Sequence, residues 1–469
     1  MKKLFLFVEL CLLFAVPAAA SPVLTPQEAV RLALEHSPQI QAANRRFDAA
    51  RAAIDQARSD KIPHLFASLG GSWQGEDGKI PAFVRVQGAA LGPLGTPIGT
   101  VVGGGAGYAL DSFTEAYAAE LGVQWLVFSS GAVENSVAAK KWAARGVDAQ
   151  TERVRQTIAH ETLACWYGLQ RARAKRAVAQ EIYDLAKEHL DQVNTFYRHG
   201  AVAKHDVLRT EAAVAESQLG LITVDNAVQL AWKGLERLVG ISLQGCYDLP
   251  EPNGRGVAQL DEPGEDDAAL RPELVALGCL KQAANASAKA AHGSLGPKLL
   301  AKGSLVAQGR QFWPNDRQDW EVGLALRWDF FDGGKASAQA REAKAKAAEA
   351  DAQIEDVKRQ IDMEIAQSRL NMTSAISRNK VAVQQEKSAS EDYRIALVRY
   401  NAAVGTNLDV LDARAQLSKA RNGVVDALYD SLLARNDYWF ALGGDPLDET
   451  FMSGAWSSEK GEEHAKSHR

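Results

Sequence analysis

The sequence predicts an α+β membrane protein in which each subunit supplies four strands to a β-barrel that continues into a long α-helical coiled-coil barrel. Three observations predict this fold class. The chain is one unit written twice, each copy holds long proline-free stretches, and each copy holds short segments that alternate between apolar and polar residues. The repeat is considered first, because a missed repeat leads to the wrong fold.

The two copies match without a gap over roughly 120 residues, a span too long for chance similarity between helices. Within this stretch the spacing is 203, as between Trp125 and Trp328 or between Gly131 and Gly334. Upstream of it the spacing is 234, as between Pro38 and Pro272. The larger spacing reflects a longer loop in the first copy, residues 75–112, which is rich in Gly and Pro. The chain therefore divides into a first repeat (21–240), a linker (241–270), a second repeat (271–444) and a polar tail (445–469).

The chain begins with a targeting segment, residues 1–20. Lys2 and Lys3 precede an apolar run, and three alanines ending at Ala20 form a cleavage site. We expect a signal peptide and an exported mature chain. No later stretch of about 18 apolar residues predicts a helical membrane span. The net charge of −5 gives no support for a nucleic-acid partner. Cys246 and Cys279 are either bridged or unpaired.

Long helices are predicted within the proline-free runs 98–249 and 315–445, whose Ala-, Glu-, Lys- and Gln-rich parts favour helix. Apolar residues recur at every seventh position, as in a coiled-coil seam; they are Val207, Val214, Leu221, Val228 and Leu235. A helix from about Gly131 to Arg198 would be about 100 Å long. Few globular proteins need that length, whereas a structure that crosses a periplasm does.

Four strands of membrane-crossing length are predicted. The clearest runs from Trp320 to Phe330, with apolar residues on one face and Glu321, Arg327 and other small or polar residues on the opposite face. The matching strand of the first copy lies around Tyr117 to Trp125, and weaker strands follow Pro63 and Pro297. Tryptophans near strand ends predict an aromatic girdle at the membrane interfaces; they are Trp73, Trp125, Trp320 and Trp328.

The number of strands predicts an oligomer. Backbone groups that face lipid must all be hydrogen-bonded, so an open sheet edge is not tolerated there. Four strands cannot close a barrel, eight would be filled by side chains, and twelve leave a pore. Three subunits therefore fit a channel best.

The chain resembles the TolC-like outer-membrane efflux proteins over nearly its whole mature length. The resemblance is carried by the opening segment Leu24–Leu34, followed by Ser37-Pro38, and by two similar helical-hairpin tips. One tip reads FYRHGAV from Phe196 and the other YNAAVGT from Tyr400, and an Asp-Val-Leu follows each. The resemblance implies a homotrimer with a 12-stranded β-barrel in the bacterial outer membrane and a coiled-coil barrel in the periplasm.

The resemblance also implies a function. The chain would be the passive exit duct of a tripartite efflux pump or a type I secretion system. Its barrel would contact outer-membrane lipid. A periplasmic adaptor, or membrane fusion protein, would couple it to an energised inner-membrane transporter of the RND, ABC or MFS type. The alternatives are a periplasmic coiled-coil adaptor and a filamentous scaffold.

The hairpin tips are the expected adaptor contacts, because small residues let another helix tip approach closely. The contact candidates are Gly200, Ala201, Val202, Ala403, Val404 and Gly405. The simpler interpretation is a helix–helix turn that needs Gly for a left-handed conformation. The two interpretations are compatible.

Tyr400, Asp409 and Asp412 are candidates for a periplasmic aperture. Rings of carboxylates around an entrance would favour cations. Members with a tight gate carry an Arg where this chain has Gly405, so an Arg–Asp gate is not expected here. The alternative for Asp206 and Asp409 is a helix cap, which we favour for both.

We expect no catalytic residues, no cofactor and no metal site. His199 and His205 near one tip are most simply solvated side chains, and the segment from Asp329 to Gly334 offers too few ligands for calcium. The transported substrate cannot be read from the sequence, since a polar lumen predicts no dedicated pocket.

Overall fold

The computed structural model describes residues 22–73, 115–251, 271–309, 312–314 and 316–444. The expected signal peptide, the loop 75–112, most of the linker and the C-terminal tail lie outside the described residues.

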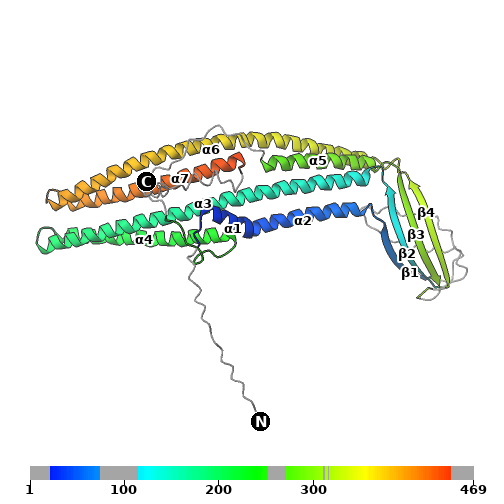
Figure 1. Ribbon diagram of the computed structural model, residues 1–469, viewed down its shortest axis with the longest axis horizontal. Coiled ribbons are helices and arrows are strands. Elements are labelled where there is room, and N and C mark those ends of the chain that lie inside the picture. The colour runs from blue at the N-terminus through cyan, green and yellow to red at the C-terminus, as the bar shows by residue number, and fades with distance from the viewer. Residues whose placement is uncertain (1–21, 74–114, 252–270, 310–311, 315, 445–469) are drawn as a thin grey trace, which may run out of the picture. The chain divides into compact units, whose positions relative to one another are not determined.

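The helices occur in pairs of equal length (Figure 1), and this confirms the internal duplication. After the short α1 (Pro26–His36), the pairs are α2 (Pro38–Ser59) and α5 (Pro272–Gly293) with 22 residues, α3 (Ala132–Arg198) and α6 (Lys335–Asn401) with 67, and α4 (Lys204–Val239) and α7 (Asn407–Leu442) with 36. The glycines that end α4 and α7 are also a matched pair. Gly240 and Gly443 have φ values of 84° and 79°, the left-handed conformation that closes a helix.

The strands form one antiparallel sheet in the order β1–β2–β3–β4. Their bounds are β1 (His64–Trp73), β2 (Glu115–Phe128), β3 (Lys298–Gly309) and β4 (Arg317–Arg327). The fourth strand differs from the expected Trp320–Phe330: it begins three residues earlier and ends at Arg327. Arg327 pairs with Lys298, the first residue of β3. Pro297 precedes Lys298 and has no N–H, so it cannot extend the hydrogen-bond ladder beyond this pair.

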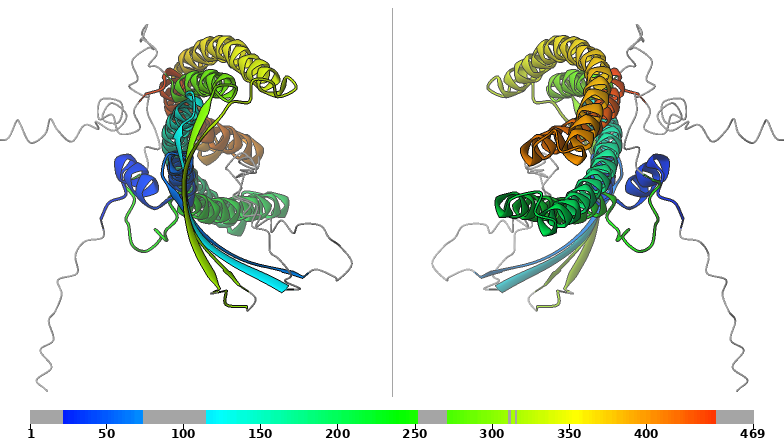
Figure 2. Two further views of the ribbon diagram at one scale, coloured as in Figure 1. Left: turned by 90° about the vertical axis from the view of Figure 1, so that its right-hand side faces the viewer. Right: turned by 90° about the vertical axis from the view of Figure 1, so that its left-hand side faces the viewer.

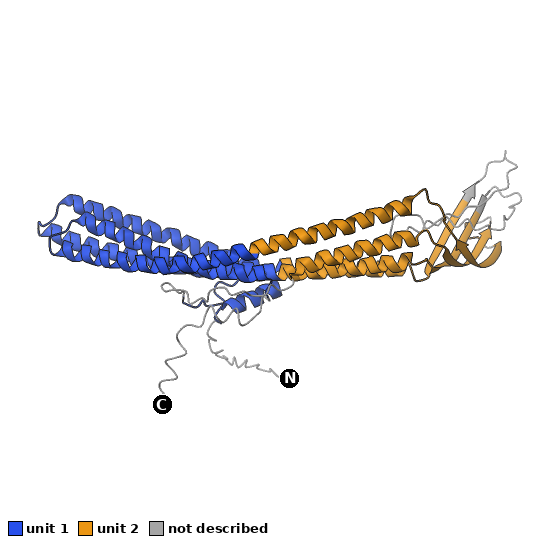
Figure 3. Cartoon of the chain, turned by 90° about the horizontal axis from the view of Figure 1, so that it is seen from above, with its two compact units in different colours: residues 1–38, 156–267, 365–469 blue, residues 39–155, 268–364 orange. Residues whose placement is uncertain are grey.

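The chain divides into two compact units (Figure 3). Unit 2 (39–155 and 268–364) holds the sheet, α2, α5 and the first parts of α3 and α6. Its strands share a marked twist (Figure 2). Charged pairs join its helices: Arg153 of α3 lies 3.4 Å from Glu273 of α5, and Arg271 lies 2.7 Å from Glu364 of α6.

Unit 1 (1–38, 156–267 and 365–469) holds α1, α4, α7 and the remaining parts of α3 and α6. Away from the tips, ion pairs give the helix order α4–α3–α7–α6. They join Arg176 of α3 to Asp225 of α4 at 2.5 Å, Arg171 of α3 to Asp430 of α7 at 3.0 Å, and Arg421 of α7 to Glu386 of α6 at 3.7 Å. The start of the described chain is anchored on α3, because the buried Trp166 donates its indole N–H to the Leu24 carbonyl at 3.1 Å.

Candidate functional site: the amphipathic sheet and the hairpin tips

One face of the sheet is apolar across all four strands. Leu305 of β3 pairs with Leu121 of β2 and with Trp320 of β4, and the neighbouring residues on this face continue the pattern. The apolar residues of β4 are between 71% and 76% exposed; they are Trp320, Val322, Leu324 and Leu326. Such a contiguous exposed apolar surface is typical of contact with lipid.

The opposite face is polar and internally paired. Lys302 of β3 lies 2.9 Å from Glu120 of β2, and Lys298 lies 3.8 Å from Asp329 beyond β4. Ser304 of β3 pairs with Glu321 of β4 on the same face. The alternation along the strands therefore separates a lipid-compatible face from a water-compatible face.

Both margins of the sheet are open. Within the described chain, β1 pairs only with β2 and β4 pairs only with β3. The outward N–H and C=O groups of these two strands need partners in a membrane. Further copies of the chain can supply these partners, because β1 of one copy can pair in antiparallel fashion with β4 of the next copy.

The two lateral helices of unit 1 also expose apolar side chains. Leu219, Ile222 and Leu230 of α4 are 58% to 65% exposed, and Leu370 and Val381 of α6 are 71% and 58% exposed. Because α4 and α6 lie at the two ends of the helix order, both ends of unit 1 carry an apolar surface suited to a neighbouring copy.

The tryptophans of the expected girdle lie towards both ends of the strands. Trp125 donates its indole N–H to the Lys61 carbonyl at 2.9 Å, and Trp328 donates to the Leu295 carbonyl at 3.0 Å, both at the helix-proximal end. Trp320 lies towards the other end of β4. The backbone of Trp73 pairs with Glu115, and its side chain is outside the described residues. The girdle itself stays a prediction.

The first hairpin tip closes α3 with a glycine, as the turn interpretation predicted. Gly200 has a φ of 73°, and its N–H donates to the Tyr197 carbonyl at 2.9 Å. The Ala201 N–H donates to the Phe196 carbonyl at 2.9 Å. These two bonds form a Schellman motif, which satisfies the last carbonyls of the helix.

The second tip has the same motif around an alanine. Ala403 has a φ of 56°, its N–H donates to the Tyr400 carbonyl at 3.0 Å, and the Val404 N–H donates to the Arg399 carbonyl at 3.0 Å. The left-handed residue is therefore Ala403 and not Gly405, which corrects the simple turn interpretation for this tip. Gly405 has a different role: a Cβ there would lie 3.1 Å from the Arg399 Cβ, so the backbone approaches closely.

The contact candidates at the tips are mostly exposed. Gly200, Ala201, Ala403 and Val404 are exposed, and Val404 reaches 67%. Val202 and Gly405 are half-buried. At the two tips, these small residues and the apolar side chain of Val404 are therefore accessible to a binding partner.

The aperture candidates lie in two different environments. Asp409 and Asp412 are exposed and one turn apart on α7. Tyr400 is only 5% exposed, and its ring lies edge-on to His189 with 5.3 Å between the ring centres. The acidic side chains can face an entrance, whereas Tyr400 supports the tip from inside its own subunit.

The capping interpretation holds for Asp409 and is wrong for Asp206. Thr406 is the N-cap of α7, its hydroxyl accepts the Asp409 N–H, and the Asp409 carboxylate accepts the Thr406 N–H at 2.9 Å. This backbone hydrogen bond holds the pKa of Asp409 below its ordinary value. Asp206 lies in the first turn of α4, whose N-cap is Ala203 without a side-chain bond.

A buried polar cluster at the tips was not foreseen from the sequence. Asn407 of α7 joins His189 of α3 and Thr210 of α4, and the three side chains are 0% to 5% exposed. The three positions share no motif or spacing, so only the folded structure brings them together. The cysteines Cys165, Cys246 and Cys279 are free in this structure, so Cys246 and Cys279 are not bridged in it.

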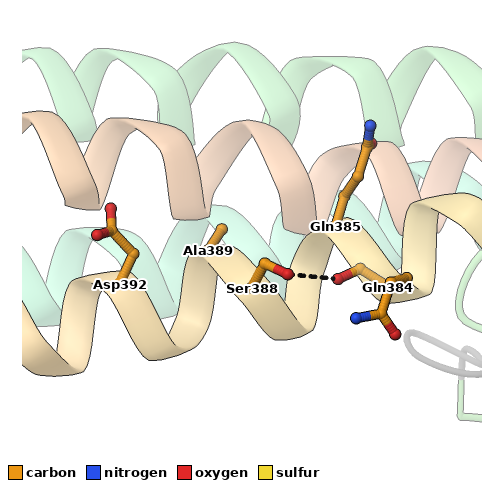
Figure 4. A pocket seen from close by; sticks show the side chains of 5 residues that line it. All are labelled: Gln384, Gln385, Ser388, Ala389 and Asp392. Atoms are coloured by element: carbon orange, nitrogen blue, oxygen red, sulfur yellow. Dashed lines mark hydrogen bonds between the residues drawn. The ribbon is translucent and has the colours of Figure 1, made fainter.

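A shallow hollow on the described surface lies along α6. It is lined by Gln384, Gln385, Ser388, Ala389 and Asp392 (Figure 4). Ser388 donates its hydroxyl to the Gln384 carbonyl of the preceding turn at 3.2 Å. All five residues come from one helix, so the hollow is surface relief on that helix.

Among the described residues, no group of three His, Cys, Asp or Glu side chains is placed to hold a metal ion. None of the described helices combines the length and the apolar character that a membrane span requires.

Comparison with known proteins identifies relatives. Residues 29–241 and 266–444 match the pattern of a family described as outer membrane efflux protein. The chain is 25% identical over 137 residues to outer membrane protein TolC of Escherichia coli (strain K12), which covers 29% of this chain and 28% of that protein. It is 25% identical over 274 residues to the alkaline protease secretion protein AprF of Pseudomonas aeruginosa, covering 56% of this chain and 55% of AprF. The chain thus spans about half or less of these two relatives.

A solved structure gives a likeness over the whole fold. The Campylobacter jejuni CmeC outer membrane channel superposes with a TM-score of 0.72 and 18% identity, covering 91% of this chain and 88% of that one. At this identity the likeness concerns the fold. The predicted fold class is confirmed.

Proposed function

This chain belongs to the outer membrane efflux protein family, and we propose that it is the passive exit duct of a tripartite efflux pump or a type I secretion system. The family resides in the outer membrane and extends into the periplasm, which sets aside the interpretation as a periplasmic adaptor. In the proposed function, three copies together close a twelve-stranded barrel and a helical barrel. An inner-membrane transporter supplies the energy.

The observation that carries the proposal is the sheet with one lipid-compatible face, one paired polar face and two open margins. A protein that only bridged two membranes in water would gain nothing from an apolar strand face. A structure that must line an aqueous path through lipid needs both faces.

The tips supply the proposed connection to the adaptor. Gly200 and Ala201 are exposed at the first hairpin tip, and Ala403 and Val404 are exposed at the second. The tip of another helical hairpin can approach these small residues closely. Asp409 and Asp412 of three copies would form acidic rings at the same end, and these rings would favour cations.

Two substrate classes fit the relatives. AprF is named for the secretion of an alkaline protease, so a secreted polypeptide is one class. The family is named for efflux, so small molecules are the other. The partner decides between them: an ABC transporter implies polypeptides, and an RND or MFS transporter implies small molecules.

Site-specific cross-linking in cells tests the adaptor contact. Cysteine at Val404 or at Ala201, joined by a short bifunctional reagent, should capture a periplasmic adaptor. The matched control is cysteine at Gln353, which is also exposed on a helix but is far from both tips in sequence. Capture from Gln353 at the same yield would contradict the tip contact.

A further inference from the structure

The buried polar cluster at the tips ties three helices together through one amide. The Asn407 Nδ2 donates to the Asp206 carbonyl at 3.2 Å and lies 3.1 Å from the Thr210 Oγ1. A carbonyl oxygen only accepts, so Nδ2 must face it, and the Asn407 Oδ1 must therefore face His189. The Oδ1 is 2.8 Å from the His189 Nε2.

This geometry assigns the proton on the histidine ring. Because Oδ1 only accepts, Nε2 must carry the hydrogen, and Nδ1 is the bare nitrogen of the neutral ring. Nδ1 is buried, and among the described residues no group hydrogen-bonds to it with normal geometry. A second proton would have to sit on Nδ1, inside the packed tip.

The surroundings of the ring disfavour that second proton. Burial lowers the pKa of His189 below its ordinary value, and the nearby Arg414 guanidinium lowers it further. The neighbouring Asn407 and Gln192 side chains act in the opposite direction without reversing the shift. The groups that act on the ring directly are Tyr400 of α6, whose ring packs against it, and Arg414 of α7. Around these two lie Tyr393 of α6 and Glu188 of α3, which interact with each other, and Asp206 of α4, which acts on Tyr400.

We propose that His189 is an acid-sensitive latch that holds the start of α7 against α3 and α4, and that uptake of a proton by its ring releases the second hairpin tip from the first. The inference rests on the proposed function, because it concerns how the periplasmic end of the duct opens. A proton from bulk solvent adds to Nδ1, and only hydrogen bonds change. The closed tip accommodates the neutral ring, and an opened, hydrated tip accommodates the imidazolium.

The sign follows from the lowered pKa. Above the ordinary histidine value of 6.5 the ring is neutral in both states, so the latch is at full strength. As the pH falls below that value, the opened tip binds a proton more readily than the closed tip, and the closed tip loses stability. Each unit by which the pKa is lowered allows about a tenfold change in the ratio of open to closed tips.

The second tip is poised for such a release. Ala403 holds a left-handed conformation that costs an alanine about 1 kcal/mol. The hydroxyl of Tyr400 is buried without a hydrogen-bond partner among the described residues. Both features cost free energy in the closed tip, and so both favour its opening.

The test uses the full-length protein reconstituted in planar lipid bilayers, with conductance recorded at about pH 7.5 and about pH 5. Wild type should show a higher open probability at the lower pH. His189→Gln keeps a donor to Asn407 but does not titrate, so it should show no rise. His199→Gln removes an exposed histidine of the same tip region and should behave as wild type.

Two outcomes overturn the proposal: a wild-type channel indifferent to pH, or a His189→Gln channel that responds as wild type does. Amide hydrogen exchange in the first turn of α7 gives an independent readout at the same two pH values. Exchange should be faster in wild type than in His189→Gln at the lower pH only. In Thr210→Val, exchange should be fast at both pH values, because valine removes the hydrogen bond to Asn407. If no variant conducts at any pH, the duct proposal fails, while the exchange measurement still decides the latch.

Discussion

Trp125 and Trp328 make the same hydrogen bond in the two halves of the chain. Each indole N–H donates to the backbone carbonyl of the turn that leads into the preceding strand, at Lys61 over 2.9 Å and at Leu295 over 3.0 Å. Lys61 and Leu295 are themselves equivalent positions of the repeat. Each bond fastens the helix-proximal end of one strand to the turn before its neighbour.

Trp328→Phe should therefore destabilise the sheet by about 1 kcal/mol, the usual net contribution of a neutral hydrogen bond. The measurement is the temperature at which the assembled protein dissociates in detergent. Trp320→Phe is the control, since no hydrogen bond of its indole occurs among the described residues. Equal effects of the two substitutions would contradict this role of the indole bond.

Ala403→Gly should stabilise the second tip by about 1 kcal/mol, because glycine adopts a positive φ without the steric penalty of a Cβ. Gly200→Ala should destabilise the first tip by a similar amount, since Gly200 occupies the equivalent left-handed position. Chemical denaturation followed by helical circular dichroism measures both. A destabilised Ala403→Gly variant would show that the strain assignment is wrong.

Glu236 makes the end of α4 sensitive to strong acid. Its carboxylate pairs with Lys233 at 2.7 Å and accepts the N–H groups of Leu243 and Gln244 at 3.0 and 3.1 Å. The Lys233 ammonium and these N–H groups lower its pKa to about 2 from the ordinary value of 4.5.

The lowered pKa means that this stabilisation is fully present above pH 4.5 and is lost as the pH falls towards about 2. Amide exchange of residues 242–247 should follow that profile in wild type. In Glu236→Gln, the amides of residues 242–247 should exchange faster at neutral pH, and their exchange should not change between pH 4.5 and about 2. The control is Glu211→Gln at an exposed position on α4, which should match wild type. A profile that survives in Glu236→Gln would rule the carboxylate out.

Neutralising the acidic ring should change ion selectivity. Asp409→Asn with Asp412→Asn should shift the reversal potential in a KCl gradient away from cation preference, most strongly at low salt, where screening is weakest. Asp206→Asn serves as the control, because this carboxylate lies on α4 in the other hairpin. An unchanged reversal potential would count against the acidic ring and leave the channel itself standing.

Much of the fold is predictable from the sequence because repetition and periodicity are local signals. The spacing between Trp125 and Trp328 aligns two 67-residue helices, and the alternation around Leu324 identifies the lipid-compatible face. The end of β4 was misplaced because a strand stops where its partner stops, and β3 begins only at Lys298.

The tips are harder to predict, since their determinants are not local. Asn407, His189 and Thr210 lie on three helices from both repeats, and no spacing links them. Ala403 takes a left-handed conformation that composition assigns to glycine, and it does so at the position equivalent to Gly200 of the first copy. Asp206 looked like a cap by analogy with Asp409, yet only the second copy has a threonine at the N-cap position.

The copy number of the purified protein tests the central claim most directly. A sheet with open margins at β1 and β4 and an exposed apolar face requires sibling chains to complete it. Native mass spectrometry of the protein released from detergent micelles should give three chains per particle. A single chain that stays dispersed in water without detergent would contradict the account.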